Sequence, residues 1–214
     1  MTILALEFSS ARRSVAVARA GALLAESVAE GGRGTHAFDL IEQALRQAKV
    51  GREEIKVVAV GLGPGSYTGI RAAIAVAQGW QLAREVQLLG ISSAAAIAWH
   101  AQTTKCFGRL QIVVDAQRGE FYLSTWEISA AQRREISPLK IFSAAEIEQR
   151  RQRGEIMVGP GETNPAHRLF PGAAAVVQLA AGRSDFVAGE SLAPIYLRET
   201  NFVKTPPPRA AATH

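Results

Sequence analysis

Cysteine is nearly absent from this chain: its 214 residues contain one, Cys106. A lone cysteine cannot form an internal disulfide or a multi-cysteine zinc or iron–sulfur site. The four histidines, His36, His100, His167 and His214, are far apart, so no pair has the i,i+4 spacing of a zinc site on one helix. We therefore expect an inert thiol, no bound metal and no catalytic metal chemistry.

Long hydrophobic runs are also missing. No apolar stretch reaches the roughly 18 residues that a membrane-spanning helix needs. The start of the chain, residues 1–7, lacks a basic leader and reaches a carboxylate at Glu7, which is unlike a secretory signal. With 48% hydrophobic and 20% charged residues, the composition predicts a globular, cytoplasmic protein with a substantial core rather than a disordered chain.

Charge of one sign is not concentrated anywhere along the sequence. The net charge of +5 comes from 24 basic and 19 acidic residues spread over the whole chain. The longest basic cluster, Arg150, Arg151 and Arg153, has acidic residues on both sides. Because a surface that follows phosphates needs clustered cations, a mixed-charge surface is favoured over a nucleic-acid-binding one.

The first half of the chain alternates strand and helix patterns. Strand-length apolar runs occupy residues 3–7, 14–19, 22–28, 55–60 and 86–89, and helical patterns occupy 35–50, 70–84 and 92–100. The helix over 35–50 is amphipathic, with Thr35 as its expected N-cap. The helix over 70–84 is apolar around most of its circumference, which indicates either a central core helix or an outer face that meets a partner.

An internal repeat divides the chain. The strand ending at Glu7 and the returning strand from Ser14 are echoed by the strand ending at Asp115 and the returning strand from Glu120. A helix over 143–152 and a strand over 156–158 follow the second hairpin. Such a repeat predicts two related α/β lobes. We assign residues 1–108 to the first lobe, 109–203 to a smaller second lobe and 204–214 to a loose tail.

The glycine-dense run from Gly61 to Arg71 lies between a strand and a helix start, where backbone N–H groups can hold an anion. It lacks the Lys-Ser/Thr of a P-loop and the last glycine of a dinucleotide fingerprint. On composition alone, a tight turn is favoured over an anion or nucleotide site. The candidate contacts for such a ligand are Gly63, Gly65, Ser66, Thr68 and Gly69.

The two strand-end acids, Glu7 and Asp115, allow two interpretations. In an ATPase-like fold, acids at equivalent strand ends hold Mg²⁺ or its waters. Otherwise they cap the turns that follow the strands. Without an accompanying lysine or a recognisable second phosphate loop, turn capping is favoured.

Several segments together resemble the TsaB (YeaZ) family. These are residues 3–10, 63–71, 90–93, 115–122 and 194–198, and the run Gly-Pro-Gly-Ser-Tyr-Thr-Gly-Ile-Arg is the most specific of them. The resemblance implies an α/β fold of the actin/Hsp70/sugar-kinase-like (ASKHA) type with two duplicated lobes. It also implies a role in the threonylcarbamoyl modification of the adenosine beside the anticodon of tRNAs that read codons beginning with A.

In that family TsaB is not the catalyst, and we expect no cofactor in this chain. It pairs with the paralogue TsaD, is joined by the ATPase TsaE, forms a homodimer when alone, and meets tRNA through the complex. The family usually has Asp where this chain has Glu7, which favours a lobe that does not hydrolyse ATP. Since helices of the first lobe form the family's interface, a four-helix bundle with the partner is expected. The residues assigned to it are Phe38, Ile41, Leu45, Ile70, Ile74 and Ala77.

The alternative is an independent ATPase or phosphotransferase of the same fold, which would use Glu7, Asp115 and the glycine loop. A metallopeptidase, suggested by the family's former glycoprotease-like label, is disfavoured because the sequence offers no metal ligands and no nucleophile with a neighbouring base.

Overall fold

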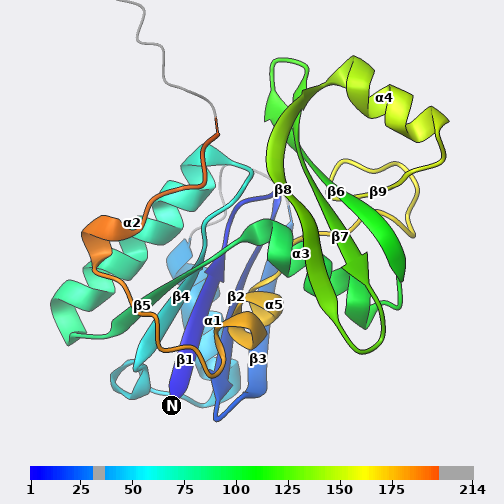
Figure 1. Ribbon diagram of the computed structural model, residues 1–214. Helices are drawn as coiled ribbons and strands as arrows, with labels where there is room; N and C mark the ends of the chain where they lie inside the picture. Colours follow the sequence, from blue (N-terminus) through cyan, green and yellow to red (C-terminus); the bar gives the residue numbers. More distant parts are fainter. Residues whose placement is uncertain (31–36, 198–214) are drawn as a thin grey trace, which may run out of the picture.

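The computed structural model describes residues 1–30 and 37–197, and Figure 1 shows them as two lobes, each built on one sheet. The strands of the first lobe are β1 (Thr2–Glu7), β2 (Arg12–Arg19), β3 (Ala22–Glu30), β4 (Val57–Gly61) and β5 (Gln87–Ile91). Those of the second are β6 (Gly108–Gln117), β7 (Glu120–Ile128), β8 (Arg133–Ser143) and β9 (Ile156–Val158). The α-helices are α1 (Ala37–Ala48), α2 (Tyr67–Arg84), α3 (Ser93–Thr103), α4 (Ala144–Gln152) and α5 (Ala173–Ala180). Short 3-10 turns lie at Arg52–Glu54 and Gly189–Ser191.

The first sheet has the order β3-β2-β1-β4-β5. Its hairpin strands β1, β2 and β3 are antiparallel, whereas β4 and β5 run parallel to β1. Strand β1 is buried along its whole length, as expected for a strand covered on both faces. All five strands predicted for this lobe are present.

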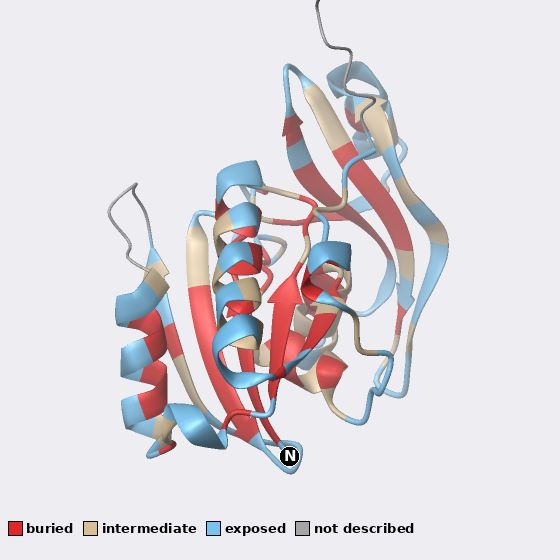
Figure 2. Ribbon diagram, turned by 90° about the vertical axis from the view of Figure 1, so that its left-hand side faces the viewer, coloured by how far each residue is buried: buried red, intermediate tan, exposed pale blue. Residues whose placement is uncertain are grey.

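Helices cover both faces of this sheet. Alternate residues of β1 point to opposite faces, so Leu4 and Leu6 pack with α1 and α2, while Ile3 and Ala5 pack with α5. Small residues line the second face, among them Ala16, Ala18 and Ala59. They allow α5 to lie close to the sheet. Figure 2 shows the result as buried inner helix faces and exposed outer ones.

The second lobe repeats the first in a reduced form. Its sheet has the order β8-β7-β6-β9, with an antiparallel hairpin followed by a helix, α4, and a parallel strand, β9. This is the order of β1, β2, β3, α1 and β4. In both lobes a glycine after the parallel strand packs closely against the backbone of the first strand or of the turn that follows it. A Cβ atom on Gly65 would overlap the carbonyl oxygen of Ser9, and a Cβ atom on Gly159 would overlap the carbonyl oxygen of Val113. The two duplicated lobes predicted from the repeat are confirmed.

The boundary of the second lobe differs from the prediction of 109–203. Helix α5 packs on β1 and β2, Val187 forms a bridge with Leu88 of β5, and Leu192 belongs to the core of the first lobe. After the second lobe the chain returns to the first lobe, because the second face of the first sheet is apolar and α5 covers it. Residues 204–214, the predicted tail, and Thr35, the predicted cap of α1, lie outside the described residues.

Two elements are absent from the sequence prediction. Strand β8 is mostly exposed and contains Pro138, so it lacks the apolar run of a buried strand. Helix α5 spans eight residues and begins at Gly172, which offers no side-chain cap. In the part of the chain that the structure describes, no helix combines the length and the apolar character needed to cross a membrane.

Candidate functional site between the lobes and on helix α2

A cleft of about 640 Å³ lies where the two lobes meet. The first lobe contributes the turn after β1 and the start of α2, and the second contributes the end of β6 and the turn after β9. Its lining residues from the first lobe are Ser9, Ser10, Ala11, Gly65, Ser66, Tyr67 and Thr68. Those from the second are Val114, Asp115, Ala116, Gln117, Tyr122, Pro160 and Gly161, and Phe170 and Tyr196 complete it.

The predicted glycine-loop residues divide between the surface and the support of this cleft. Gly65, Ser66 and Thr68 line it, whereas Gly63 and Gly69 are buried behind it. Ser66 is the N-cap of α2, because its Oγ accepts a hydrogen bond from Gly69 N at 3.3 Å. Its own N–H donates to Ser9 O at 2.6 Å. The run forms a tight turn that caps a helix, and an anion or nucleotide contact at these residues stays a prediction.

Glu7 is completely buried rather than presented to the cleft. Its Oε1 accepts a hydrogen bond from Ser9 N, and its Oε2 accepts one from Ser93 Oγ, each at 2.8 Å. Burial raises the pKa of the Glu7 carboxyl, and the hydrogen bonds from Ser9 and Ser93 offset part of that rise. This acid fastens the turn after β1, which agrees with turn capping.

Asp115 occupies the equivalent place in the second lobe, but it is exposed and lines the cleft. Its carboxylate accepts hydrogen bonds from Gln117 N at 2.6 Å and Gln117 Nε2 at 3.0 Å. Gln117 and Arg118 both have positive φ, so the aspartate supports a tight hairpin turn. In residues 1–30 and 37–197, no three His, Cys, Asp or Glu side chains gather as a metal site would require.

Three tyrosines that lie at the cleft were not predicted as site residues from the sequence. The rings of Tyr67 and Tyr196 are 5.1 Å apart, and Arg71 donates to the Tyr67 hydroxyl at 2.7 Å. Burial raises the pKa of Tyr196 to about 12, and the neighbouring Tyr67 and Tyr122 add to the rise. All three lie inside the recognised motifs, but nothing in their spacing showed that they would line one cleft.

Where the structure describes the histidines and the cysteine, their contacts are of a kind that supports the fold. His100 Nδ1 lies 2.9 Å from the carbonyl oxygen of Phe170, and His167 lies in a turn. Burial raises the pKa of the Cys106 thiol, which makes it a weaker nucleophile at neutral pH, as an inert thiol should be. His36 and His214 lie outside the described residues.

The predicted partner interface needs correction. Ile41, Leu45, Ile70, Ile74 and Ala77 are buried in the core of the first lobe, and only Phe38 is exposed, at 69%. The apolar face of each helix covers its own sheet, as a layered α/β fold requires. Five of the six side chains therefore lie behind the surface that a partner could reach.

The outer face of α2 is nonetheless apolar. Between the exposed Arg71 and Arg84 it carries Ala75, Gly79, Leu82 and Ala83, all exposed, with Leu82 at 89%. We call Ala75, Gly79, Leu82 and Ala83 the α2 outer face; Figure 2 shows α2 in front of the first sheet, with exposed positions along the helix. Of the two sequence alternatives for this helix, a core helix buried on all sides is excluded within the monomer. An exposed leucine on a helix of small residues suits close packing of another helix.

Comparisons with known proteins agree on one family. A family model described as TsaD, tRNA N6-adenosine threonylcarbamoyltransferase, matches residues 35–181. The tRNA threonylcarbamoyladenosine biosynthesis protein TsaB of Escherichia coli strain K12 is 31% identical over 88 residues, which are 41% of this chain and 38% of that protein. The protein of the same name from Buchnera aphidicola subsp. Schizaphis graminum is 30% identical over 123 residues, 56% of this chain and 58% of that one. The matches thus span less than two thirds of these relatives' own length.

A solved structure resembles the fold over most of its length. YeaZ from Pseudomonas aeruginosa has a TM-score of 0.75 and 24% identity, and the match covers 92% of this chain and 99% of that one. The predicted α/β fold with two duplicated lobes is therefore confirmed.

Proposed function

Because the chain belongs to the protein family described as TsaD, tRNA N6-adenosine threonylcarbamoyltransferase, as a TsaB (YeaZ) member of it, we propose that it acts in threonylcarbamoyladenosine biosynthesis on tRNA. Its role is that of a non-catalytic subunit that pairs with a TsaD paralogue and is joined by the ATPase TsaE. The modified base is the adenosine beside the anticodon of tRNAs that read codons beginning with A. Two features of the chain support the division of labour.

The position of Glu7 is the observation that carries the non-catalytic role. An ATPase of this architecture needs its strand-end acid to reach Mg²⁺ or its waters in the cleft. Here the carboxylate is buried, and hydrogen bonds from Ser9 and Ser93 occupy both of its oxygens. Its raised pKa further disfavours the charged form that a cation would need.

The α2 outer face supports the pairing. When a second helix covers exposed apolar surface on a first helix, the burial of that surface stabilises the complex. Leu82 would be the main anchor, because it is a large side chain among alanines and a glycine. When the chain is alone, a second copy can cover the same face, which accounts for a homodimer. Contact with tRNA then arises within the complex.

Reconstitution tests the proposal. The purified chain is assayed for ATP hydrolysis alone, and then, with TsaD and TsaE, for threonylcarbamoyladenosine formation on unmodified tRNA supplied with threonylcarbamoyl adenylate as the donor. We expect no turnover above background from the chain alone and product only in the mixture that contains all three proteins. Brisk turnover by the chain alone would establish the ATPase or phosphotransferase alternative instead. If TsaD and TsaE form the full amount of product without this chain, the proposed role in the pathway is wrong.

A further inference from the structure

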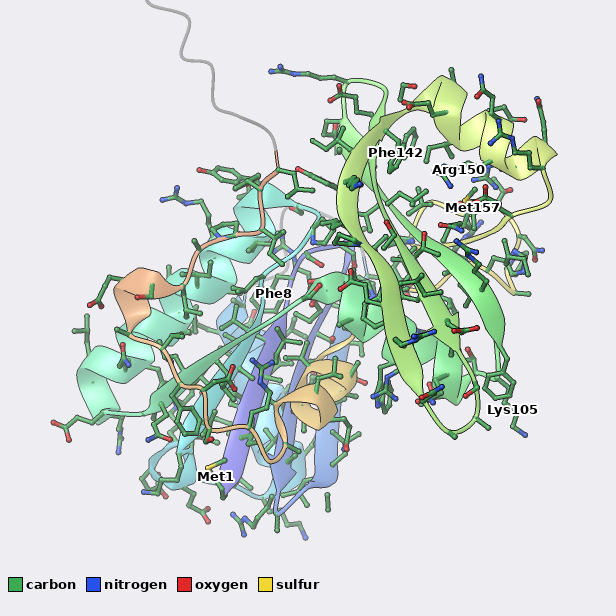
Figure 3. The ribbon with its side chains drawn as sticks, in the orientation of Figure 1. Met1, Phe8, Lys105, Phe142, Arg150 and Met157 are labelled. Atoms are coloured by element: carbon green, nitrogen blue, oxygen red, sulfur yellow. The ribbon has the colours of Figure 1, made fainter. Side chains whose placement is uncertain are left out.

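A second hollow, of about 400 Å³, lies in the second lobe at the C-terminal end of α4. It is lined by Arg109, Gln111, Arg150, Arg153, Gly154, Glu155 and Ile156, and we call it the arginine pocket. Three arginines face one glutamate there. Figure 3 shows Arg150 beside Phe142 next to α4, in the part of the lobe farthest from α2.

The fold creates this concentration of charge, which the sequence does not show. Arg109 is far from the basic cluster in sequence, but the pairing of β6 with β9 brings it beside residues 153–156. Of the acids that flank the cluster, Glu155 lines the pocket, whereas Glu146 and Glu148 do not. Hydrogen bonds from Ser143 lower the pKa of Glu146, and the charge of Arg150 adds to that effect. Glu146 accepts from Ser143 at the start of α4, and Glu148 accepts from Gln152. The sequence-based preference for evenly mixed charge therefore does not hold at this place.

Two neighbours hold the arginine pocket in shape. The guanidinium of Arg150 lies 4.9 Å from the centre of the Phe142 ring and forms an ion pair with Glu155 at 3.0 Å. Gln111 is only 2% exposed, and its Oε1 accepts a hydrogen bond from Thr125 Oγ1 at 2.6 Å. Since that oxygen is occupied, the group that Gln111 can offer to a ligand is its amide N–H. The pocket thus offers the guanidinium groups and this amide as donors, beside the Glu155 carboxylate, whose charge is paired with Arg150.

A structural role explains only part of this arrangement. Arg150 in the last turn of α4 and Arg153 at its C-cap complement the negative end of the helix dipole, which accounts for these two residues. It does not account for Arg109, which starts β6. The acid opposite Arg109 on β7 is Glu127, and Glu127 forms an ion pair with Arg134 at 2.8 Å. Arg109 therefore adds positive charge that no helix end requires.

We propose that the arginine pocket binds a backbone phosphate of tRNA. Guanidinium groups bind phosphate oxygens with paired hydrogen bonds, and backbone contacts of this kind fix the position of a nucleic acid without reading its sequence. The choice of tRNA as the RNA rests on the proposed function. The pocket and the α2 outer face lie in different lobes, so the chain can hold a protein on one and RNA on the other (Figure 1).

Titration of unmodified tRNA into the purified chain at several salt concentrations tests this site. The variant is Arg109→Gln/Arg153→Gln, and the control is Arg46→Gln/Arg52→Gln, which removes the same charge from exposed positions of the first lobe. Loss of two phosphate contacts should weaken binding about 10-fold or more and lower the salt slope by about 1 to 2. The control should bind within about 2-fold of the unaltered chain. Circular dichroism confirms that both variants fold.

The outcomes are separable from those of the proposed function. Equal tRNA binding by the variant and the control would overturn the arginine pocket as an RNA site, as would no binding by the unaltered chain at low salt. Loss of TsaD capture by the variant with unchanged tRNA binding would show that an acidic protein segment occupies the pocket, which also overturns the proposal. Failure of the unaltered chain to capture TsaD would count against the proposed function alone.

Discussion

Ser93 Oγ donates a hydrogen bond to Glu7 Oε2 at 2.8 Å, although the two residues are 86 positions apart. The same Oγ accepts from Gly63 N at 3.1 Å. One serine thus joins the end of β1, the glycine loop and the start of α3 behind the cleft. This contact removes Glu7 from the cleft and makes it part of the framework.

Glu7→Gln should flatten the pH dependence of stability. A carboxyl whose pKa is raised by folding holds its proton more tightly in the folded protein, so its contribution is full below its ordinary pKa of 4.5 and is lost as pH rises through the raised value. A glutamine cannot ionise, so this loss disappears. Urea unfolding from pH 4 to 8 measures it. Glu53→Gln, at an exposed position, should keep the original profile.

Gly69→Ala should destabilise the protein by about 1–3 kcal/mol, because its new Cβ would overlap the carbonyl oxygen of Phe8. Gly79→Ala, in the same helix, is the matched control. Nothing lies within 4 Å of a Cβ there, so better helix propensity should stabilise the protein by about 0.5–1 kcal/mol. Thermal unfolding of both variants is the measurement. Similar shifts in the two would contradict the close approach of α2 to β1.

Leu82→Glu should weaken capture of the TsaD paralogue by about 10-fold or more while the fold is kept, because it places a charge on the α2 outer face. Leu23→Glu makes the same change at a 44% exposed leucine of β3 and should leave capture unchanged. Pull-down with circular dichroism decides the matter. Ala77→Glu is unsuitable, since Ala77 is fully buried and the charge would disrupt the core.

Arg151→Met should cost more stability than Arg134→Met. Arg151 donates to both carboxylate oxygens of Glu162, at 2.9 and 2.6 Å, and the Glu162 side chain is only 6% exposed. Without the Arg151 guanidinium, the buried Glu162 carboxylate loses its ion-pair partner, which should lower the free energy of unfolding by about 1–3 kcal/mol. Arg134 and Glu127 form an exposed ion pair, for which about 0–1 kcal/mol is expected. Denaturant unfolding compares the two, and equal losses would refute the difference.

Local patterns predicted the elements that have strong periodicity or clear caps. The amphipathic helix predicted over 35–50 is α1, which buries one face, and the helix predicted over 143–152 is α4, which Ser143 caps. The repeat ending at Glu7 and Asp115 led directly to the two lobes. Strand β8 was missed because exposure and a proline hide a strand that depends on pairing with β7. Helix α5 was missed because it is short and uncapped.

The site was predicted less well than the fold, for a physical reason. An apolar helix face indicates burial, but the sequence does not say whether the cover is the chain's own sheet or a partner. Ile41 and Ile74 therefore looked like interface residues and lie in the core. Contacts between distant segments, such as Tyr67 with Tyr196, have no local signature. The glycine run could be placed between a strand and a helix start because its capping of α2 is local, whereas its role as a ligand contact stays a prediction.

The position of α5 also determines when the first lobe can be completed during synthesis. One face of its sheet is covered by a helix that the ribosome makes only after the whole second sheet. During synthesis, one face of the first sheet therefore stays partly uncovered until that helix has been made. Its exposed alanines and valines would be open to chaperones until residues 173–192 emerge. A chain that ends before them should be degraded or aggregate, even though both sheets would be complete.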